Sequence, residues 1–538
     1  MRIALYGLPC AGKTTLLAQL TEIKTVSGSE ELKRLCKGNF SDLSDSEQTA
    51  ARVKYTEYLR SLDNEIVLSD GHFSFLDKVV FTDADADVYD VFLYLYCNPE
   101  VLSERYQNSP KNERYRKLPT TRIANWQINE IERLREECHK RNRDFYVLKS
   151  EGLTPKMLLD FIGEIKNGYS SFGVAERIVA GVKEKFPQVC KINIVDGDKT
   201  LVKEDLFGCC SSRTTHTFDG GFYTGYQSLC FAEETKDVQF DCGKLSRVNL
   251  NSEVFDRISG EGYIVLSSGI AELWEQLGAL LGIKNIFASP LISADTKFFV
   301  VKLLRESGYT VTAFGDSKID LYMLRAANEG FLYLGERMSR SLYNVDVSGI
   351  NLIYSREPIV LADIDDSLTE AIELTKSDSG VNGGRLAAAH FRLGEKLGAA
   401  IGKAFPAIKT AVVVMERGGR FFGDGLYSAF GGVLYPYNPA KDSFPDVSRH
   451  EIVIIADSVV NTASSVLNVI ARIKTQNPRA EIIVAANVVQ QNALAKLSGY
   501  KLFAVRVSGN FFVGRKQAVQ TGETGPDTAD RLFNLIDS

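Results

Sequence analysis

The stretch RIALYGLPCAGKTT, residues 2–15, joins a short apolar run to a glycine-rich loop that ends in Gly-Lys-Thr-Thr. Residues 3–6 predict a buried strand, and the residues after the loop predict a helix. The spacing is GxxxxGK[ST], in the strand–loop–helix setting that this phosphate-binding pattern requires. Backbone N–H groups at a helix start bind phosphate, while a lysine neutralises its charge and a hydroxyl coordinates Mg²⁺. We therefore predict an ATP site made of Gly7, Gly12, Lys13, Thr14 and Thr15, with Thr14 also a magnesium ligand.

The segment around this loop, residues 1–165, alternates apolar runs with charged helical stretches. Apolar runs at 66–69, 91–96 and 145–148 predict further strands, and residues 128–140 predict a helix. This alternation is typical of a parallel α/β sheet, so we expect a first α/β domain over residues 1–165.

This first segment resembles the small P-loop kinases that act on nucleosides and nucleotides. The resemblance implies that Asp70, which follows the second apolar strand, acts as the catalytic base. It also implies a basic lid that includes Arg105, Arg114 and Arg116, among which we assign Arg114 to ATP binding. A turn aspartate and a solvated helix face are the alternative interpretations of these residues.

A second α/β pattern begins near residue 189, and an acidic motif follows its first strand at 192–195. The motif reads Asp196-Gly-Asp198-Lys-Thr200. A carboxylate at a strand end can attack phosphorus, and a second carboxylate two residues on can protonate the leaving group. We predict these catalytic roles for Asp196 and Asp198, with an ordinary acidic turn as the alternative.

The motif and three later segments resemble the haloacid dehalogenase superfamily of aspartate-nucleophile phosphatases, in its phosphoserine-phosphatase branch. The resemblance implies a domain over residues 170–355 with Ser267 and Lys297 as phosphate-binding residues. The GDxxxD pattern at 315–320 implies a magnesium site, because carboxylates are the ligands that hard cations prefer. The implied magnesium ligands are Asp196, Asp198, Asp316 and Asp320.

About 60 residues separate the second motif from the first, enough for a small cap domain over residues 201–262. Within it, the aromatic segment 218–226 is expected either to face the substrate or to form the core of the cap. Small soluble phosphomonoesters are the substrates that a capped site implies.

A third α/β pattern covers residues 380–538, with apolar runs at 411–415, 451–456, 482–486 and 502–507. The 451–456 run leads into Asp457-Ser-Val-Val-Asn-Thr-Ala-Ser-Ser465, which resembles the phosphoribosyl pyrophosphate (PRPP) loop of type I phosphoribosyltransferases. The segments at 416–426 and 525–533 resemble further motifs of uracil phosphoribosyltransferase. The implied PRPP-binding residues are Arg417, Asp457, Asn461, Thr462, Ser464, Ser465, Asp527 and Asp530.

This third segment departs from the family pattern at two positions. Ala463 and Asn534 stand where the family carries glycine. An added Cβ at Ala463 would crowd a phosphate if that position needed a positive φ. These departures leave open which base is used, or whether only a ribose phosphate binds.

Composition narrows the partners of the chain. With 538 residues and a net charge of −5, the chain has no global basic field, which disfavours nucleic acid as a substrate. Nine cysteines without a CxxC pair fit a reducing cytoplasm, and the absence of a long apolar run predicts no membrane span. Resemblance to the uracil enzymes implies a homodimer through the third domain.

Together these patterns predict three consecutive α/β domains and a multifunctional enzyme of nucleobase and nucleotide metabolism. The expected activities are an ATP-dependent kinase, a magnesium-dependent phosphomonoester phosphatase and a PRPP-dependent transferase. Two alternatives stay open. One is a kinase–phosphatase that heals nucleic-acid ends, and the other is a kinase–phosphatase regulated by a C-terminal domain that senses PRPP or a nucleotide.

Overall fold

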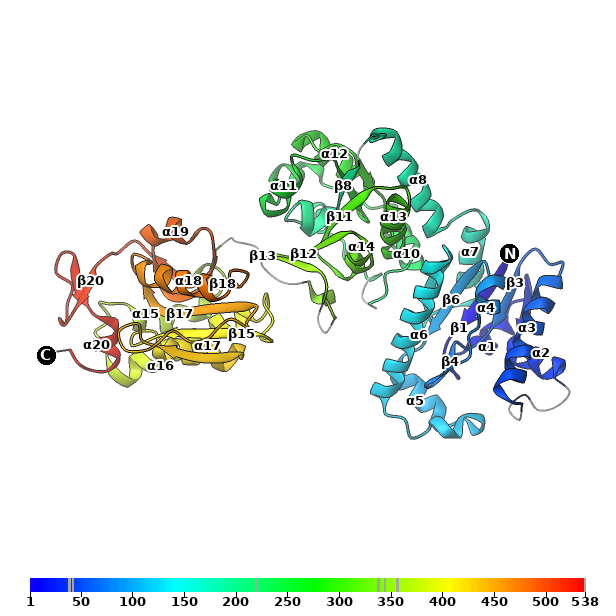
Figure 1. Ribbon diagram of the computed structural model, residues 1–538, viewed down its shortest axis with the longest axis horizontal. Coiled ribbons are helices and arrows are strands. Elements are labelled where there is room, and N and C mark those ends of the chain that lie inside the picture. The colour runs from blue at the N-terminus through cyan, green and yellow to red at the C-terminus, as the bar shows by residue number, and fades with distance from the viewer. Residues whose placement is uncertain are drawn as a thin grey trace. The chain divides into compact units, whose positions relative to one another are not determined.

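The computed structural model describes residues 1–536 except 37–39, 41–42, 189, 218–220, 336–338, 343–344 and 355–357. The chain forms two compact units, Met1–Leu332 with Asn344–Asn351 and Tyr333–Tyr343 with Leu352–Ser538. Three main sheets are flanked by helices, so the predicted α/β class is confirmed (Figure 1). The first two sheets belong to the first unit, although the division passes through the last two strands of the second sheet.

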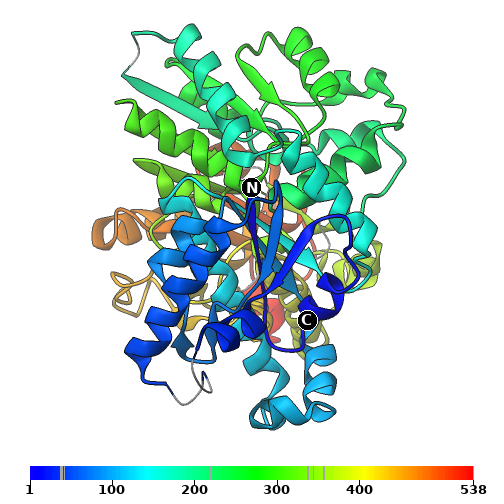
Figure 2. The same cartoon turned by 90° about the vertical axis from the view of Figure 1, so that its right-hand side faces the viewer.

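The first sheet has the apolar run 3–6 at its centre. Because parallel strands are covered on both faces, a central strand is apolar throughout, as this run is. Figure 2 shows the strands near the N-terminus with helices on both sides. In spatial order the strands are β2 (Lys24–Ser27), β3 (Val67–Asp70), β1 (Arg2–Tyr6), β6 (Val91–Tyr96) and β7 (Asp144–Lys149).

Helices accompany this sheet, and a short antiparallel pair, β4 (Ser74–Phe75) and β5 (Lys78–Val79), follows β3. The helix predicted at 128–140 begins earlier, just after Pro119. The helices are α1 (Lys13–Leu17), α2 (Gly28–Leu35), α3 (Asp45–Ser61), α4 (Asp83–Val88), α5 (Pro99–Gln107), α6 (Thr120–Lys140) and α7 (Pro155–Lys166).

The second sheet places the strand before the acidic motif, β8, between the two strands that carry the other predicted phosphatase motifs. The carboxyl ends of parallel neighbours meet at one edge, where sites form in α/β folds. In spatial order the strands are β10 (Ile286–Ala288), β9 (Tyr263–Ser267), β8 (Lys191–Val195), β11 (Thr310–Gly315), β12 (Glu329–Gly335) and β13 (Asn351–Tyr354).

Helices surround this second sheet, and those between β8 and β9 belong to the insertion that the sequence predicts as a cap. Part of the aromatic segment within this insertion, residues 218–220, lies outside the described residues. The helices are α8 (Ser171–Lys185), α9 (Leu206–Cys210), α10 (Gly225–Thr235), α11 (Ser252–Ile258), α12 (Ala271–Leu281), α13 (Ala294–Glu306) and α14 (Leu321–Ala326).

The insertion binds the edge strand of the first sheet. At the start of α10, Thr224 accepts a hydrogen bond from the Val147 N–H at 3.1 Å, and Gln227 donates to the Val147 carbonyl at 2.8 Å. Phe222 packs edge-on against Tyr96, with 4.7 Å between ring centroids. Residues 222–227 therefore help to join the insertion to the first sheet. Their hydrogen bonds also satisfy polar backbone groups that an unpaired edge strand would expose.

A buried charge cluster also joins the first two sheets. Arg135 and His139 on α6 both contact Asp295 on α13, at 3.0 Å and 2.8 Å. Asp295 is 1% exposed. Burial alone would raise the pKa of its carboxyl, but the guanidinium and the histidine lower it. The charge pairing keeps Asp295 ionised inside this contact.

The third sheet begins earlier in the chain than predicted, because β14 pairs with β19. The strand predicted at 451–456 continues to Val460, because it pairs with β18 along its full length. Asp457 therefore lies inside a strand. In spatial order the strands are β14 (Ile359–Val360), β19 (Lys501–Ser508), β18 (Glu481–Gln490), β17 (Ile452–Val460), β15 (Thr410–Met415) and β16 (Val433–Tyr437).

The remaining elements of the second unit cover this sheet and its carboxyl edge. A small parallel pair, β20 (Val513–Arg515) and β21 (Thr524–Pro526), precedes the last helix. The helices are α15 (Thr369–Thr375), α16 (Gly383–Ile401), α17 (Arg420–Phe430), α18 (Ser464–Gln476), α19 (Gln491–Leu497) and α20 (Thr528–Leu532).

Candidate functional site

The phosphate loop takes the shape that its glycines permit. Gly7 has a φ of 153°, and a Cβ there would lie 2.7 Å from the Leu95 carbonyl oxygen. Gly12 has a φ of 106° and directly precedes α1. Both conformations are strained for any residue with a side chain. The loop thus turns tightly and presents backbone N–H groups at the start of the helix.

Lys13 is buried within this loop, 6% exposed. Its Nζ donates to the carbonyls of Gly7 at 2.6 Å and Leu8 at 3.0 Å. Burial lowers the pKa of this ammonium to about 8, although the nearby Asp70 carboxylate opposes the shift. The Lys13 ammonium is therefore held by two backbone carbonyl groups of the loop. Among the described residues, no carboxylate forms an ion pair with it.

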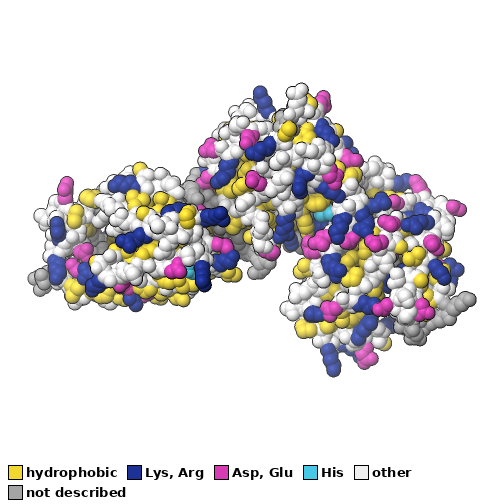
Figure 3. Space-filling model, in the orientation of Figure 1, with side chains coloured by type: hydrophobic (Ala, Val, Ile, Leu, Met, Phe, Trp, Pro, Cys, Tyr) yellow, Lys and Arg dark blue, Asp and Glu magenta, His cyan; other side chains and the backbone are white. Residues whose placement is uncertain are grey.

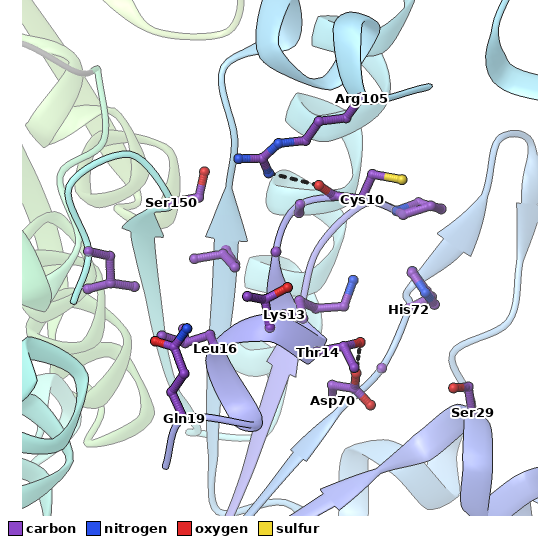
Figure 4. A pocket seen from close by; sticks show the side chains of 17 residues that line it. Cys10, Lys13, Thr14, Leu16, Gln19, Ser29, Asp70, His72, Arg105 and Ser150 are labelled. Atoms are coloured by element: carbon purple, nitrogen blue, oxygen red, sulfur yellow. Dashed lines mark hydrogen bonds between the residues drawn. The ribbon is translucent and has the colours of Figure 1, made fainter. Parts of the chain in front are cut away.

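Asp70 stands beside the loop at the end of β3. Its Oδ2 accepts a hydrogen bond from Thr14 Oγ1 at 3.3 Å, and its Oδ1 accepts one from the Gly28 N–H at 2.8 Å (Figure 4). His72, two residues on, lies with Nδ1 3.0 Å from the Gly7 carbonyl oxygen. Burial, followed by the charge of Lys13, holds the pKa of His72 well below its usual value, so this imidazole is neutral.

A cavity of about 590 Å³ opens over the loop. Of the residues predicted for ATP binding and catalysis, it is lined by Gly12, Lys13, Thr14, Thr15 and Asp70. Arg105 reaches the cavity and donates to the Cys10 carbonyl at 2.9 Å (Figure 4). Arg114 does not line it, and its guanidinium lies over the rings of Phe75 and Tyr115. The sequence analysis assigned Arg114 to ATP binding, whereas the arginine of the basic segment that lines this cavity is Arg105.

Beside the second sheet, Lys297 forms ion pairs with two of the predicted carboxylates, Asp196 and Asp320. It lies in the first turn of α13 and is 1% exposed. Its Nζ contacts Asp196 Oδ1, and Asp320 Oδ1 at 2.8 Å. Burial would lower the pKa of this lysine, but the two carboxylates raise it, so the ammonium is firmly charged. Burial and then Asp320 raise the pKa of Asp196 to about 7 against the opposing effect of Lys297.

Three carboxylates form a cluster fit for a cation. Asp196, Asp316 and Asp320 each offer an oxygen, and these atoms lie within 4.8 Å of one another. Burial and then the carboxylates of Asp320 and Asp196 raise the pKa of Asp316, and the ammonium groups of Lys199 and Lys297 oppose this shift. Hard divalent cations such as Mg²⁺ prefer oxygen ligands of this kind. The donor set therefore fits the predicted metal.

Asp198 was predicted as a fourth metal ligand, but its carboxylate lies outside this cluster. It accepts hydrogen bonds from the Leu206 N–H at 2.7 Å, from Ser267 Oγ at 3.1 Å and from Trp274 Nε1 at 3.1 Å. Burial and then Asp205 raise its pKa. Three donors therefore hold this carboxylate, while the carboxylate cluster is made of Asp196, Asp316 and Asp320.

Trp274 on α12 is a site residue that the sequence analysis missed. It is fully buried, and its ring fills the space that a Cβ on Gly197 would occupy, 2.2 Å from Trp274 Cζ2. Gly197 is therefore required by this ring as well as by the motif. Nothing in the spacing of the tryptophan indicates its role, because α12 and β8 are far apart in sequence.

The third sheet has a cavity of about 570 Å³ at its carboxyl edge. Asp457 lies there with its Oδ1 2.7 Å from the Ser458 N–H, and burial raises its pKa to about 7. Arg417 also lines the cavity and donates to Asp530 Oδ1 at 3.2 Å. Of the predicted PRPP-binding residues, those that line the cavity are Arg417, Asp457, Asn461 and Asp527.

The other predicted PRPP-binding residues lie beyond that cavity lining. Thr462, Ser464 and Ser465 are exposed near the start of α18, and Thr462 Oγ1 lies 3.0 Å from Ser464 Oγ. Ala463, between them, has a φ of 63°. This is the conformation that favours glycine, so a methyl group stands where the sequence comparison expects none.

One family model matches the region of the first sheet. Residues 3–144 match the model of a family described as an AAA domain. This match agrees with the nucleotide-binding loop, and the N-terminal part of the chain is a P-loop domain. No curated protein matches the chain in sequence.

Solved structures give only weak similarities. The AQ2163 protein from Aquifex aeolicus is 12% identical with a TM-score of 0.27, covering 34% of this chain and 100% of its own. The protein TT1426 from Thermus thermophilus is 18% identical with a TM-score of 0.19, covering 23% and 86%. A HAD family hydrolase from Salmonella enterica subsp. enterica serovar Typhi is 16% identical with a TM-score of 0.20, covering 32% and 75%. Scores at this level support no conclusion about family or activity.

The surface and the helices bear on the expected partners. On the face drawn in Figure 3, basic and acidic side chains are interspersed. Among the described helices, none combines the length and the apolar character needed to cross a bilayer.

Proposed function

We propose that this chain is a multifunctional enzyme that combines an ATP-dependent kinase with a metal-dependent phosphomonoester phosphatase. The observation that carries the proposal is a pair of buried lysines, Lys13 and Lys297, at the carboxyl edges of two parallel sheets. Each stands beside carboxylates suited to phosphoryl chemistry, Asp70 in one case and Asp196 with Asp320 in the other. The AAA-domain match supports the nucleotide-binding half of this proposal.

In the kinase step, the loop and Lys13 hold the phosphates of ATP, and Arg105 lies where it can add positive charge. Thr14, which donates a hydrogen bond to Asp70, would hold Mg²⁺, which supplies charge stabilisation to the phosphates when bound. Asp70 accepts the proton of the acceptor hydroxyl as the hydroxyl oxygen bonds to the γ-phosphorus and the bond to the departing ADP breaks. The neutral His72 helps to shape the acceptor side of the cavity.

In the phosphatase step, Asp196 attacks phosphorus and forms an aspartyl-phosphate. Asp198 gives a proton to the leaving oxygen and later takes one from the attacking water. Lys297 balances the negative charge of the site. Mg²⁺, which Asp196, Asp316 and Asp320 would hold, supplies positive charge for the phosphoryl oxygens when bound.

For the third sheet we propose a PRPP-dependent transferase site. The cavity that brings together Arg417, Asp457, Asn461 and Asp527 supports it. The positive φ of Ala463 instead favours a second candidate, a domain that binds a ribose phosphate without transfer and regulates the other two activities. We place the three sites in one metabolite class: nucleobases, nucleosides and their phosphates.

The kinase–phosphatase proposal is tested with the purified full-length protein and two single variants, Lys13→Met and Asp196→Asn. A nucleoside panel with labelled ATP measures phosphorylation, and a panel of nucleoside monophosphates with Mg²⁺ measures phosphate release. We expect Lys13→Met to remove only the first activity and Asp196→Asn only the second. An oligonucleotide with a 3′-phosphate is included, and its efficient turnover would replace this proposal with nucleic-acid end healing.

A further inference from the structure

The cavity of the third sheet has a polar wall that the sequence motifs do not include. In the register of β18 and β19, Val488 pairs with Arg506 and Gln490 with Ser508. Residues two apart on a strand point to the same face, so these four side chains lie on one face of the sheet. All four line the cavity. The carboxyl ends of two adjacent strands thus form one wall, next to the strand that carries Asp457.

Two polar atoms on this wall are buried without hydrogen bonds. Gln490 is 5% exposed, and its Oε1 makes no hydrogen bond with any described residue. The Nε of the half-buried Arg506 is likewise unpartnered within the described part of the chain. Buried polar groups are nearly always satisfied in folded proteins, so two orphaned atoms at one cavity wall indicate a ligand or water that completes them.

Gln490 Oε1 and Arg506 Nε require different hydrogen-bond partners. The Gln490 oxygen requires a hydrogen-bond donor, whereas the Arg506 guanidinium requires an acceptor. The nearby carboxylates of Glu373 and Asp378 already stabilise the positive charge of Arg506. A fully deprotonated anion such as a carboxylate would satisfy the arginine only, because it has no donor for the glutamine. A group with an N–H beside a carbonyl satisfies both residues at once.

We infer that Gln490 and Arg506 select a planar heterocycle with a ring N–H next to a ring carbonyl, and reject one with an amino–imine edge. The N–H donates to Gln490 Oε1 and the carbonyl accepts from Arg506. Phe512 lines the same cavity and offers an aromatic surface to a flat ring. This inference deepens the proposed function of the third domain and rests on it. The two residues determine specificity, while the phosphoribosyl group is left to Arg417, Asp457 and Asp527.

The test is equilibrium binding to the full-length protein with Mg²⁺ and saturating ribose 5-phosphate. At the edge away from the nitrogen that would carry ribose, uracil and hypoxanthine present an N–H beside a carbonyl, and cytosine and adenine present an amino group beside an imine nitrogen. We expect the first pair to bind at least about tenfold more tightly, the effect of one or two hydrogen bonds to buried groups. Gln490→Leu should abolish this preference.

Gln491→Leu is the matched control, because Gln491 is the exposed neighbour outside the cavity lining. Gln490→Glu is the conservative variant, since it keeps the acceptor oxygen and should retain the preference even if Gln490→Leu fails to fold. Equal binding of both pairs, a preference for the amino–imine pair, or an unchanged preference in Gln490→Leu overturns the inference.

Binding of ribose 5-phosphate alone is measured separately with Asp457→Ala. If ribose 5-phosphate binds and no base does, the specificity inference falls while the proposed phosphoribosyl site stands. If bases bind selectively and ribose 5-phosphate does not, the proposed site falls and the assignment to Gln490 and Arg506 stands. Failure of both ligands to bind overturns both.

Discussion

Lys13 and Lys297 are both almost fully buried at the carboxyl edge of a parallel sheet, yet their electrostatic settings differ. Lys13 donates to two backbone carbonyls, and burial lowers its pKa to about 8. Lys297 lies between Asp196 and Asp320, which raise its pKa. One positive charge is left to be balanced by a ligand, and the other is balanced within the fold.

This difference in charge balance indicates how each site is prepared electrostatically before a ligand binds. At the phosphate loop, a bound triphosphate would supply the missing negative charge. Nucleotide binding should therefore raise the pKa of Lys13 and keep its ammonium protonated. In the second sheet, Lys297 already offsets part of a carboxylate cluster that would otherwise repel a phosphate. A fixed charge arrangement of this kind stabilises a transition state without reorganisation.

The largest effect is expected from Lys297→Met. Removing one partner of a buried ion pair costs about 3–5 kcal/mol, because two carboxylates are left uncompensated. We expect the phosphatase activity to fall by at least about 100-fold and the second sheet to unfold at a lower urea concentration. The measurement uses Trp274 fluorescence in a Trp126→Phe background, because the chain has only 2 tryptophans.

Lys191→Met is the control for this variant. Lys191 pairs with Glu261 at 2.8 Å, but its side chain is 52% exposed. Solvent-exposed ion pairs contribute little to stability, so this change should leave both readings nearly unaltered. Equal losses from the two variants would mean that burial of Lys297 between carboxylates has no special role.

Lys13→Met should produce the opposite balance of effects. ATP binding is expected to weaken by about 100-fold, because a charge-assisted contact to phosphate is lost. Stability should change far less than for Lys297→Met, since the variant leaves no buried carboxylate bonded to the lost ammonium. Calorimetric titration with ATP and urea unfolding measure the two quantities. A stability loss as large as that of Lys297→Met would break the comparison.

The pH dependence of stability, measured by urea unfolding between pH 7 and pH 11, separates the two lysines as well. The folded-state pKa of about 8 for Lys13 lies below its ordinary value of 10.5, so the unfolded chain binds more protons between these values. Stability from this group therefore rises with pH from 8 to 10.5. Lys297 has a raised pKa, so its contribution is present below 10.5 and is lost as the pH rises further.

The apparent affinity for Mg²⁺ should decrease as Asp196 becomes protonated. Its folded-state pKa of about 7 exceeds the ordinary 3.8, so without metal the folded chain holds an extra proton between these values, and this group lowers stability as the pH rises through that window. Mg²⁺ must displace the proton, and we expect its apparent affinity to fall by up to about tenfold per pH unit below 7. Titrations of Mg²⁺ at pH 5.5, 6.5 and 7.5 measure this, and a pH-independent affinity would contradict it.

How much the sequence predicts depends on whether a residue acts locally. The phosphate loop and the strand ends at Asp196 and Asp316 were found because their geometry lies within a few consecutive residues. The α/β class was predicted for a similar reason, since buried parallel strands are apolar throughout. Arg114 was assigned to ATP binding in place of Arg105, because the direction of each side chain in this basic segment is set by packing against distant residues.

Other features depend on contacts that no local pattern records. The docking of α10 on β7 needs Thr224 and Gln227 to meet the backbone of Val147 across the fold. The extension of β17 through Asp457 comes from its pairing with β18. Strands such as β2 and β16 were missed because they are short and lie at sheet edges, where the apolar pattern is weak.

The smallest effect is expected from Trp274→Phe, which removes one donor to Asp198 and keeps most of the aromatic ring. Burial is the main cause that raises the pKa of Asp198, and the hydrogen bond from Trp274 opposes it. Without that bond, we expect the pKa of Asp198 to rise and the phosphatase rate to fall by about tenfold at most, the effect of a single hydrogen bond. The rate measured against pH should show the Asp198-dependent limb moved upward. Trp126→Phe is the matched control, because Trp126 donates to Ser74 in β4, outside the phosphatase cluster, and should leave this pH profile unchanged. A lower rate with an unmoved profile would indicate that Trp274 supports packing around Gly197 and does not position the Asp198 carboxylate.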